Sequence, residues 1–215
     1  MLLFRALLIA LLTTGLIGGC GEPPQPTVNL YRAVHTGNLD QIKRHLFWKT
    51  DINRPGPEGD FPLHVAVSQG RVAIARELLR HGARVDVRDS LGRTPLHVAL
   101  ANGKVPAAAL LVEAGADDDR QALLFDLTSE GALDRDTLDF LTARGVDINA
   151  ENPDGQAPLH TAVAAGDVRL SKRLIGAGAD VNLANTSGET ALTIAERQDE
   201  PTMVKLLEQF GAARD

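Results

Sequence analysis

Four segments of this chain repeat one pattern at a nearly constant spacing, and this repetition constrains the fold more than any other feature. The segments are FPLHVAVSQG, TPLHVALANG, APLHTAVAAG and TALTIAERQD, which begin at Phe61, Thr94, Ala157 and Thr190. Successive starts are 33, 63 and 33 residues apart, and the middle interval is two periods less three residues. A degenerate copy is therefore expected between residues 124 and 156, and a fixed period of this length indicates stacked structural units.

The segment that follows each copy is also repeated. It contains leucine or isoleucine and ends in glycine and alanine: ARELLRHGA, AALLVEAGA, SKRLIGAGA and VKLLEQFGA. Together the two segments resemble the ankyrin repeat, over essentially residues 28–213. The resemblance implies an all-α solenoid of about six helix–turn–helix repeats with β-turn fingers. We place this domain at 28–215, with repeats at about 28–60, 61–93, 94–121, 122–156, 157–189 and 190–215.

The residue types in the repeat suit this architecture. Thr94 is a good N-cap, and Pro95 suits the first helical position, where its missing N–H has no partner to lose. Leu96 and Ala99 fall on one helical face. Gly103 falls where a short first helix should end in a left-handed cap. One unit cannot bury its own apolar face, so about three or more units must stack.

The third and fourth repeats depart from the pattern. The finger after repeat 3 reads GADDDRQALL and is short by about five residues. Repeat 4 lacks the Pro and His of the motif and carries about two extra residues between its helices. Two interpretations are open: a binding notch around Asp117–Arg120, or sequence drift in an internal repeat that its neighbours hold in place.

Three histidines share the motif position: His64, His97 and His160. Neighbouring repeats lie about 10 Å apart, which is too far for shared metal ligation at about 2 Å. The resemblance implies instead that these histidines make hydrogen bonds that fix the turn. The run Asp117–Asp119 could attract Ca²⁺, but it lacks the alternation and distal Glu of a calcium loop. We expect no metal site.

The sequence carries no recognisable catalytic motif. It lacks a nucleophile elbow, a phosphate-cradling glycine loop and an H-E-x-x-H pair. The caps and turns of the repeat account for its Ser, His and Asp residues. The formal net charge is −6 without a basic cluster, whereas nucleic-acid binding needs a basic footprint. We therefore expect no enzyme, cofactor, small-molecule substrate or nucleic-acid partner.

Residues 1–19 have the layout of a signal peptide: one early cation, an apolar run and small residues at the end. The run from Ala6 to Gly19 is 14 residues, whereas a membrane span needs about 20. An uncleaved N-terminal anchor stays open as the alternative.

The end of this run, Ile17-Gly18-Gly19-Cys20, resembles the lipobox of bacterial lipoproteins. The resemblance implies cleavage before Cys20, acylation of its thiol and a lipid-anchored protein of the bacterial envelope. It would face the periplasm from the outer or the inner membrane. The alternative is a chance cysteine after an ordinary signal peptide. Residues 20–27 are proline-rich and are expected to form an extended tether of roughly 20 Å.

The resemblance also implies a partner-binding surface, since ankyrin proteins bind partners with finger tips and first helices. Trp48, the sole tryptophan, is a further candidate: it is either an interface anchor or packs beneath the first finger or against the tether prolines. The candidate residues are Arg54, Glu58, Arg88, Asp89, Ser90, Glu151, Asn152, Asn185 and Thr186 at the fingers, Ser68, Gln69 and Asn102 on the helical floor, and Trp48.

Three functions remain as hypotheses. The first is a binding scaffold or accessory subunit of the envelope, with an unidentified protein partner. The second is an immunity protein that inhibits a periplasmic or membrane-active toxin such as a lipase. The third, an enzyme, would need a cleft with convergent polar groups that this sequence does not show.

Overall fold

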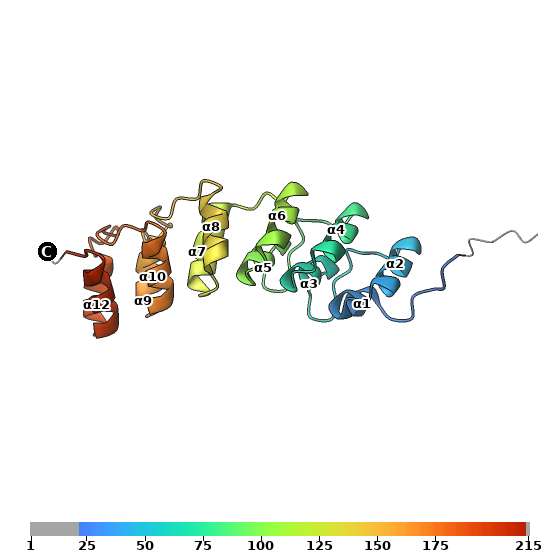
Figure 1. Cartoon of the computed structure of the whole chain (residues 1–215), viewed down its shortest axis with the longest axis horizontal. Helices are drawn as coiled ribbons and strands as arrows, with labels where there is room; N and C mark the ends of the chain where they lie inside the picture. Colours follow the sequence, from blue (N-terminus) through green and yellow to red (C-terminus); the bar gives the residue numbers. More distant parts are fainter. Residues whose placement is uncertain (1–21, 214–215) are drawn as a thin grey trace, which may run out of the picture.

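The computed structural model describes residues 22–213, which form twelve helices in six successive pairs along one axis (Figure 1). The predicted signal peptide and Cys20 lie outside these residues. Within residues 22–213 no strand is formed, and no helix is long and apolar enough to cross a membrane. The first helices are α1 Leu30–Thr36, α3 Pro62–Ser68, α5 Pro95–Ala101, α7 Arg120–Ser129, α9 Pro158–Ala164 and α11 Ala191–Arg197, and the second helices are α2 Leu39–Phe47, α4 Val72–Arg80, α6 Val105–Glu113, α8 Arg135–Thr142, α10 Val168–Gly176 and α12 Pro201–Gln209.

The helices are short, and local sequence fixes where they begin. In α5 the Thr94 hydroxyl accepts a hydrogen bond from the N–H of His97 at 3.1 Å, and Pro95 takes the first helical position. Five of the six first helices have seven residues. Isolated helices below about 12 residues are marginal in water, so these helices depend on packing against their neighbours.

One continuous core runs through the stack. In five successive repeats the same leucine of the first helix is buried between neighbouring units: Leu63, Leu96, Leu124, Leu159 and Leu192. Burial of a leucine side chain contributes about 1.5–3 kcal/mol. The alignment of Leu124 with the others, in a repeat that lacks the motif, confirms that the degenerate copy is a structural unit of the all-α solenoid.

The proline-rich segment is not a free spacer where the structure describes it. The N–H of Thr27 donates to Gln41 Oε1 at 2.8 Å, and the carbonyl of Val28 lies 2.7 Å from Nε2 of the buried His45. The Trp48 indole N–H donates to the carbonyl of Pro23 at 3.1 Å. Of the alternatives for Trp48, packing against the tether is therefore observed.

Asparagine side chains join successive fingers like rungs of a ladder. Asn53 donates to the carbonyl of Gly82 at 3.0 Å and accepts from the N–H of Arg84 at 2.9 Å. Asn149 and Asn182 make the equivalent two bonds to the next repeat. Each rung satisfies backbone groups near the end of the neighbouring second helix.

The ladder is interrupted between repeats 2 and 3. The residue equivalent to Asn53 in the next finger is Asp86, and its carboxylate pairs instead with Arg84 of its own finger at 3.1 Å. After α6 the short connection is bridged by Gln121, whose side-chain amide donates to the carbonyl of Asp147 at 2.9 Å and accepts from the N–H of Asp147 at 3.0 Å. The rungs that the described residues form therefore join repeats 1 and 2, 3 and 4, 4 and 5, and 5 and 6.

We expect Asn53→Ala to lower the free energy of unfolding by about 1 kcal/mol, because both backbone partners lose an intramolecular hydrogen bond. Asp86→Ala is the matched control at the equivalent position. Its pair with Arg84 is exposed, so its loss should leave the stability essentially unchanged. Urea denaturation measures both, and equal losses would show that the rung adds nothing.

Candidate functional site

The connection between α6 and α7 is the shortest of those between repeats. It comprises residues 114–119, six residues, whereas α4 and α5 are joined by residues 81–94, fourteen residues. The connection is thus eight residues shorter. Helix α7 has ten residues and α5 has seven, so the longer helix accounts for three of the eight and about five residues are absent from the chain. Gly115, with φ +94°, closes α6. The predicted short finger is confirmed.

The motif histidine normally ties its repeat to the next finger. In repeat 2 the N–H of Phe61 points at Nδ1 of His64 at 3.4 Å, so Nε2 carries the proton and donates to the carbonyl of Arg93 at 3.0 Å. Burial lowers the pKa of His64, against the opposing effects of the Arg93 carbonyl and the Asp89 carboxylate. The neutral imidazole is thus a structural link, as the resemblance implied.

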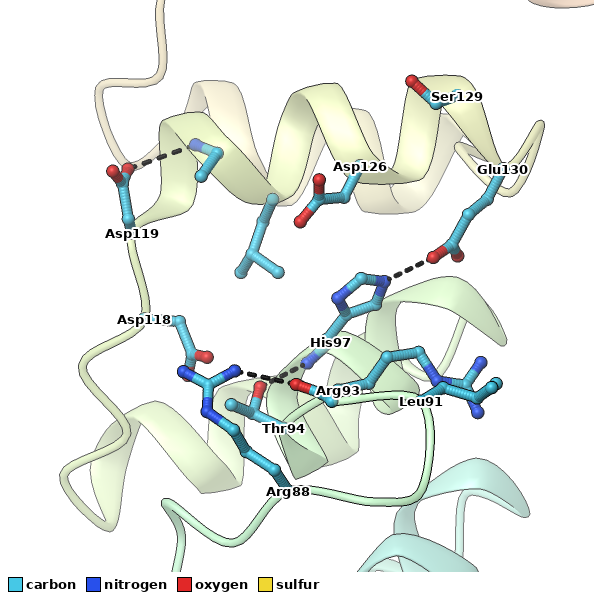
Figure 2. A pocket seen from close by; sticks show the side chains of 13 residues that line it. Arg88, Leu91, Arg93, Thr94, His97, Asp118, Asp119, Asp126, Ser129 and Glu130 are labelled. Atoms are coloured by element: carbon cyan, nitrogen blue, oxygen red, sulfur yellow. Dashed lines mark hydrogen bonds and ion pairs between the residues drawn. The ribbon is translucent and has the colours of Figure 1, made fainter.

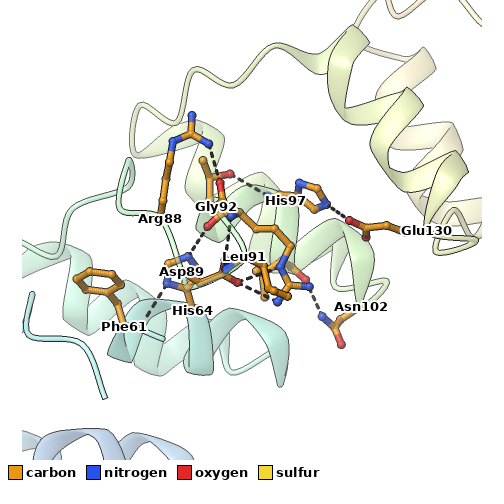
Figure 3. A network of polar contacts seen from close by, with 12 residues as sticks. Phe61, His64, Arg88, Asp89, Leu91, Gly92, His97, Asn102 and Glu130 are labelled. Carbon is orange, nitrogen blue, oxygen red and sulfur yellow. Dashed lines mark hydrogen bonds and ion pairs between the residues drawn. The ribbon is translucent and has the colours of Figure 1, made fainter. Parts of the chain in front are cut away.

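His97 has no such finger to bind. His160 in repeat 5 also binds a backbone carbonyl of the next finger, with Nε2 2.8 Å from that of Leu183. Nε2 of His97 lies instead 3.0 Å from a carboxylate oxygen of Glu130, at the C-terminal end of α7 (Figure 3). The shortened finger has therefore redirected a structural histidine toward an acidic side chain of the next repeat.

The space that a full finger would fill is a groove between α5 and α7 (Figure 2). Its volume is about 800 Å³. The finger before α5 forms one wall and the outer face of α7 the other. The lining residues are Arg88, Leu91, Gly92, Arg93, Thr94, His97, Asp118, Asp119, Ala122, Leu123, Asp126, Ser129 and Glu130.

Acidic side chains outnumber basic ones along the groove. Its guanidinium groups are those of Arg88 and Arg93, and its carboxylates are those of Asp118, Asp119, Asp126 and Glu130. Leu91 is 72% exposed at the rim. The groove therefore offers negative charge beside an apolar lip.

Asp89 holds the wall of this groove together. One carboxylate oxygen accepts from the backbone N–H groups of Leu91 at 2.9 Å and Arg93 at 2.8 Å, and the other accepts from Arg93 Nε at 2.9 Å (Figure 3). Burial acts to raise the pKa of Asp89, but the hydrogen bonds from the backbone and side chain of Arg93 outweigh it and lower the pKa. Arg88 is folded back onto the carbonyl of Gly92 at 2.7 Å.

Two other predicted finger residues accept the finger N–H groups with an amide oxygen in place of a carboxylate. Asn152 and Asn185 each accept two backbone N–H bonds inside their own fingers, at 2.9–3.0 Å. Asp89 and Asn185 are only 6% and 5% exposed. Their placement on the partner-binding surface is therefore corrected: these side chains turn inward because the tight finger needs an internal acceptor for its N–H groups.

The remaining predicted residues are spread along the solenoid, and Arg88 alone among them lines the groove. Arg54, Glu58, Ser90, Glu151 and Thr186 are exposed on the fingers, Gln69 and Asn102 are exposed beyond the ends of α3 and α5, and Ser68 is half-buried. Sequence reasoning identified the notch at Asp117–Arg120 but missed Asp126, Ser129 and Glu130. The signal was the short finger before repeat 4, which leaves His97 without its usual partner.

The chain belongs to the ankyrin-repeat family: a model of three ankyrin repeats matches residues 30–122 and again residues 126–213. Among solved structures, the human ASB11 ankyrin repeat domain is 28% identical, with a TM-score of 0.67 over 86% of this chain and 85% of that chain. An ankyrin repeat domain from Acinetobacter baumannii is also 28% identical, with a TM-score of 0.61 over 86% of this chain and 98% of the other.

A third similar structure is a complex of a predatory endopeptidase with an immunity protein from Bdellovibrio bacteriovorus. The matching chain is 27% identical, with a TM-score of 0.62 over 84% of this chain and 96% of that chain. Among curated relatives, a putative palmitoyltransferase ZDHHC13 of Danio rerio is 28% identical over 83% of this chain and 23% of its own length. The chain thus spans about a quarter of such relatives, and their activities are not transferred to it.

We expect Asp89→Ala to lower the free energy of unfolding by about 1–3 kcal/mol, because two finger N–H groups lose their acceptor. Asp89→Asn is the matched control, since asparagine fills this position in two other fingers. It keeps the acceptor and loses only the partly exposed pair with Arg93, which costs about 1 kcal/mol or less. Equal losses in urea denaturation would show that charge, and not the acceptor, holds the finger.

The wild type and Asp89→Asn should also differ in how their free energy of unfolding depends on pH. The pKa of Asp89 is below its ordinary 3.8 in the folded chain, so its charge stabilises the fold above pH 3.8 and this stabilisation is lost as pH falls through the folded pKa. The stability gap between the wild type and Asp89→Asn should therefore narrow below about pH 4.

Proposed function

We propose that this chain is a non-catalytic, protein-binding module of a bacterial cell envelope, anchored by lipid at Cys20, that holds a basic segment of its partner in the groove between α5 and α7. Membership of the ankyrin family supports protein binding. The groove at the missing finger is the observation that carries the choice of site, because it is a recess with a distinct charge in an otherwise regular stack.

The chemistry of the groove favours a partner that presents lysine or arginine. Arg93 is already paired with the buried Asp89, which leaves the carboxylates of the groove largely uncompensated. Complementary charge guides association and excludes wrong partners. The exposed Leu91 at the rim supplies an apolar contact beside the charged floor. A basic loop with a flanking apolar residue fits both features.

The polar groups of the groove support a non-catalytic role. His97 could act as a base, and Glu130 orients its ring. The described residues, however, give the imidazole no hydrogen bond to a serine, threonine or other side-chain nucleophile, so the parts of a covalent mechanism do not converge here.

The envelope location rests on the N-terminal sequence. The apolar run, the two glycines and the single cysteine together form a lipobox-like site, and at least two acyl chains would hold the protein stably on a membrane. The proposed location is the inner leaflet of the outer membrane, and the inner membrane is the alternative.

An immunity protein is the second candidate function, and the similarity to a chain of the endopeptidase–immunity protein complex favours it. In this version the bound partner is a toxic enzyme of the envelope, and binding blocks it. A scaffold would bind its partner without changing the partner's activity. Titration of the purified partner with this protein separates the two: inhibition complete at one equivalent supports immunity, and unchanged activity supports a scaffold.

The groove is tested by charge reversal. Asp126 is exposed on α7 within the groove, whereas Glu113 is exposed at the end of α6 outside it. We expect Asp126→Lys to weaken partner capture at least tenfold, because a like charge in an interface costs on the order of 1.4 kcal/mol or more. Glu113→Lys should leave capture unchanged.

The measurement uses a photo-crosslinking residue at Ser129, in intact cells, followed by mass spectrometry. The same crosslinker at Ala165, on the corresponding edge of repeat 5, is the background control. If both positions capture the same proteins, or if Asp126→Lys captures as well as the wild type, the groove is not the binding site.

The lipid anchor has its own test. We expect Cys20→Ala to move the protein from the membrane fraction to the soluble fraction, because the variant has no thiol to acylate. Mass spectrometry of the N-terminal peptide of the wild type should show the acyl groups. Retention of Cys20→Ala in the membrane fraction would support an uncleaved N-terminal anchor instead.

A further inference from the structure

Exposed apolar side chains gather at one end of the solenoid. Of the five large exposed hydrophobic residues in the described chain, three belong to α2 and its C-cap: Leu39 at 50%, Phe47 at 52% and Trp48 at 38%. The rings of Phe47 and Trp48 pack edge to face with centroids 5.5 Å apart. This pair and Leu39 form the aromatic end of the solenoid.

The aromatic pair has no structural counterpart in the other repeats that share this helix. Helices α4, α6, α10 and α12 are nine residues long, as α2 is, so their last residue and C-cap can be compared directly. Charged, small or polar residues stand there in the first three: Arg80 and His81, Glu113 and Ala114, Gly176 and Ala177. Helix α12 ends in Gln209 and Phe210, so it carries a single aromatic residue. The fold does not require an aromatic pair at this place.

Cations flank the aromatic end. Lys43 lies one turn before Phe47 on the outer face of α2, Arg44 lies beside it, and Lys49 follows Trp48. Within residues 22–213 no ion pair involves these three side chains. Residues 39–51 carry these three cations against Asp40 and Asp51, in a chain whose formal net charge is −6. This segment therefore has a small positive net charge within an acidic protein.

The N-terminal segment begins its contact with the domain at this same place. The Trp48 indole donates to the carbonyl of Pro23, and Cys20 precedes Pro23 by three residues. Three residues of extended chain span about 10 Å at most. An anchor at Cys20 therefore keeps the aromatic end within about 10 Å of the point where the chain enters the membrane surface.

We infer that the aromatic end lies in the headgroup region of the membrane that carries the anchor, and that it fixes the orientation of the solenoid. Tryptophan and phenylalanine favour this region, and the long side chains of Lys43 and Lys49 can reach toward lipid phosphates. The inference rests on the proposed lipid anchor for its short tether. The chain enters at the α2 end and its C-terminus lies at the opposite end (Figure 1), so the groove between α5 and α7 is held away from the bilayer.

Trp48 is the only tryptophan, so its fluorescence reports on this surface alone. We expect its emission in the anchored, full-length mature protein to be quenched about twofold or more by vesicles that contain brominated phosphatidylcholine and phosphatidylglycerol, because bromine quenches indole only at close approach in the interface. The matched control is Trp48→Phe combined with Phe210→Trp. Phe210 is the C-cap residue of α12, 44% exposed, at the far end of the solenoid, and this reporter should not be quenched.

A second variant tests the contact itself. Phe47→Glu places at this position the residue that repeat 3 carries, Glu113, and Phe47 is half exposed, so the fold should persist. Quenching of Trp48 should then fall by about half or more. Quenching of Trp48 no greater than that of the far-end reporter overturns the inference, and so does capture of a protein at Phe47 by a photo-crosslinker while Trp48 stays unquenched.

The lipid anchor and the aromatic end can fail separately. Because Cys20 is the only cysteine, a phospholipid maleimide attached to its thiol supplies an anchor that does not depend on natural acylation. Quenching with this synthetic anchor supports the aromatic end even if the cellular protein carries no acyl groups. Natural acylation without quenching leaves the proposed function in place and removes the membrane-facing surface.

Discussion

The structure depends on one constraint: a pair of helices of seven and nine residues cannot bury its own apolar face. Leu63, Leu96 and Leu124 are shielded only because another repeat lies against each of them. Stability in such a stack is a sum of repeat and neighbour contributions, so the groups that join neighbours decide its shape. Here those groups are the core leucines, the motif histidines and the asparagine rungs between fingers.

The loss of about five residues after α6 redirects one of these joining groups and leaves a volume unfilled. His97 binds Glu130 where its counterparts bind a backbone carbonyl, and the vacated volume becomes the acidic groove. The distinctive site of this protein thus arises from a deletion, with the regular repeats on either side serving to hold its walls. Family membership explains the scaffold, and the irregular repeat explains where a partner of particular charge would bind.

The sequence was sufficient for the fold because period, N1 proline and closing glycine all repeat. It also located the notch, since missing residues are visible without a structure. It did not predict that Asp89 and Asn185 turn inward. A polar residue at a finger tip is expected to be exposed, and only the structure shows the hydrogen bonds that these side chains accept from the finger N–H groups. Asp126 and Glu130 were missed because repeat 4 lacks the motif that sets its register. The docking of Thr27 and Val28 was missed because proline-rich segments usually extend freely, whereas the contact of Trp48 with the tether was among the alternatives.

The interrupted ladder gives the solenoid a place to bend. Among the described residues repeats 2 and 3 lack a rung, at Asp86, whereas the other neighbouring repeats are joined by Asn53, Gln121, Asn149 and Asn182. Rotation at the boundary between repeats 2 and 3 therefore has fewer hydrogen bonds to remake than rotation at the other boundaries. The finger of residues 81–94 lies at this boundary and forms one wall of the groove, so such a rotation changes the width of the groove and the curvature of the solenoid together.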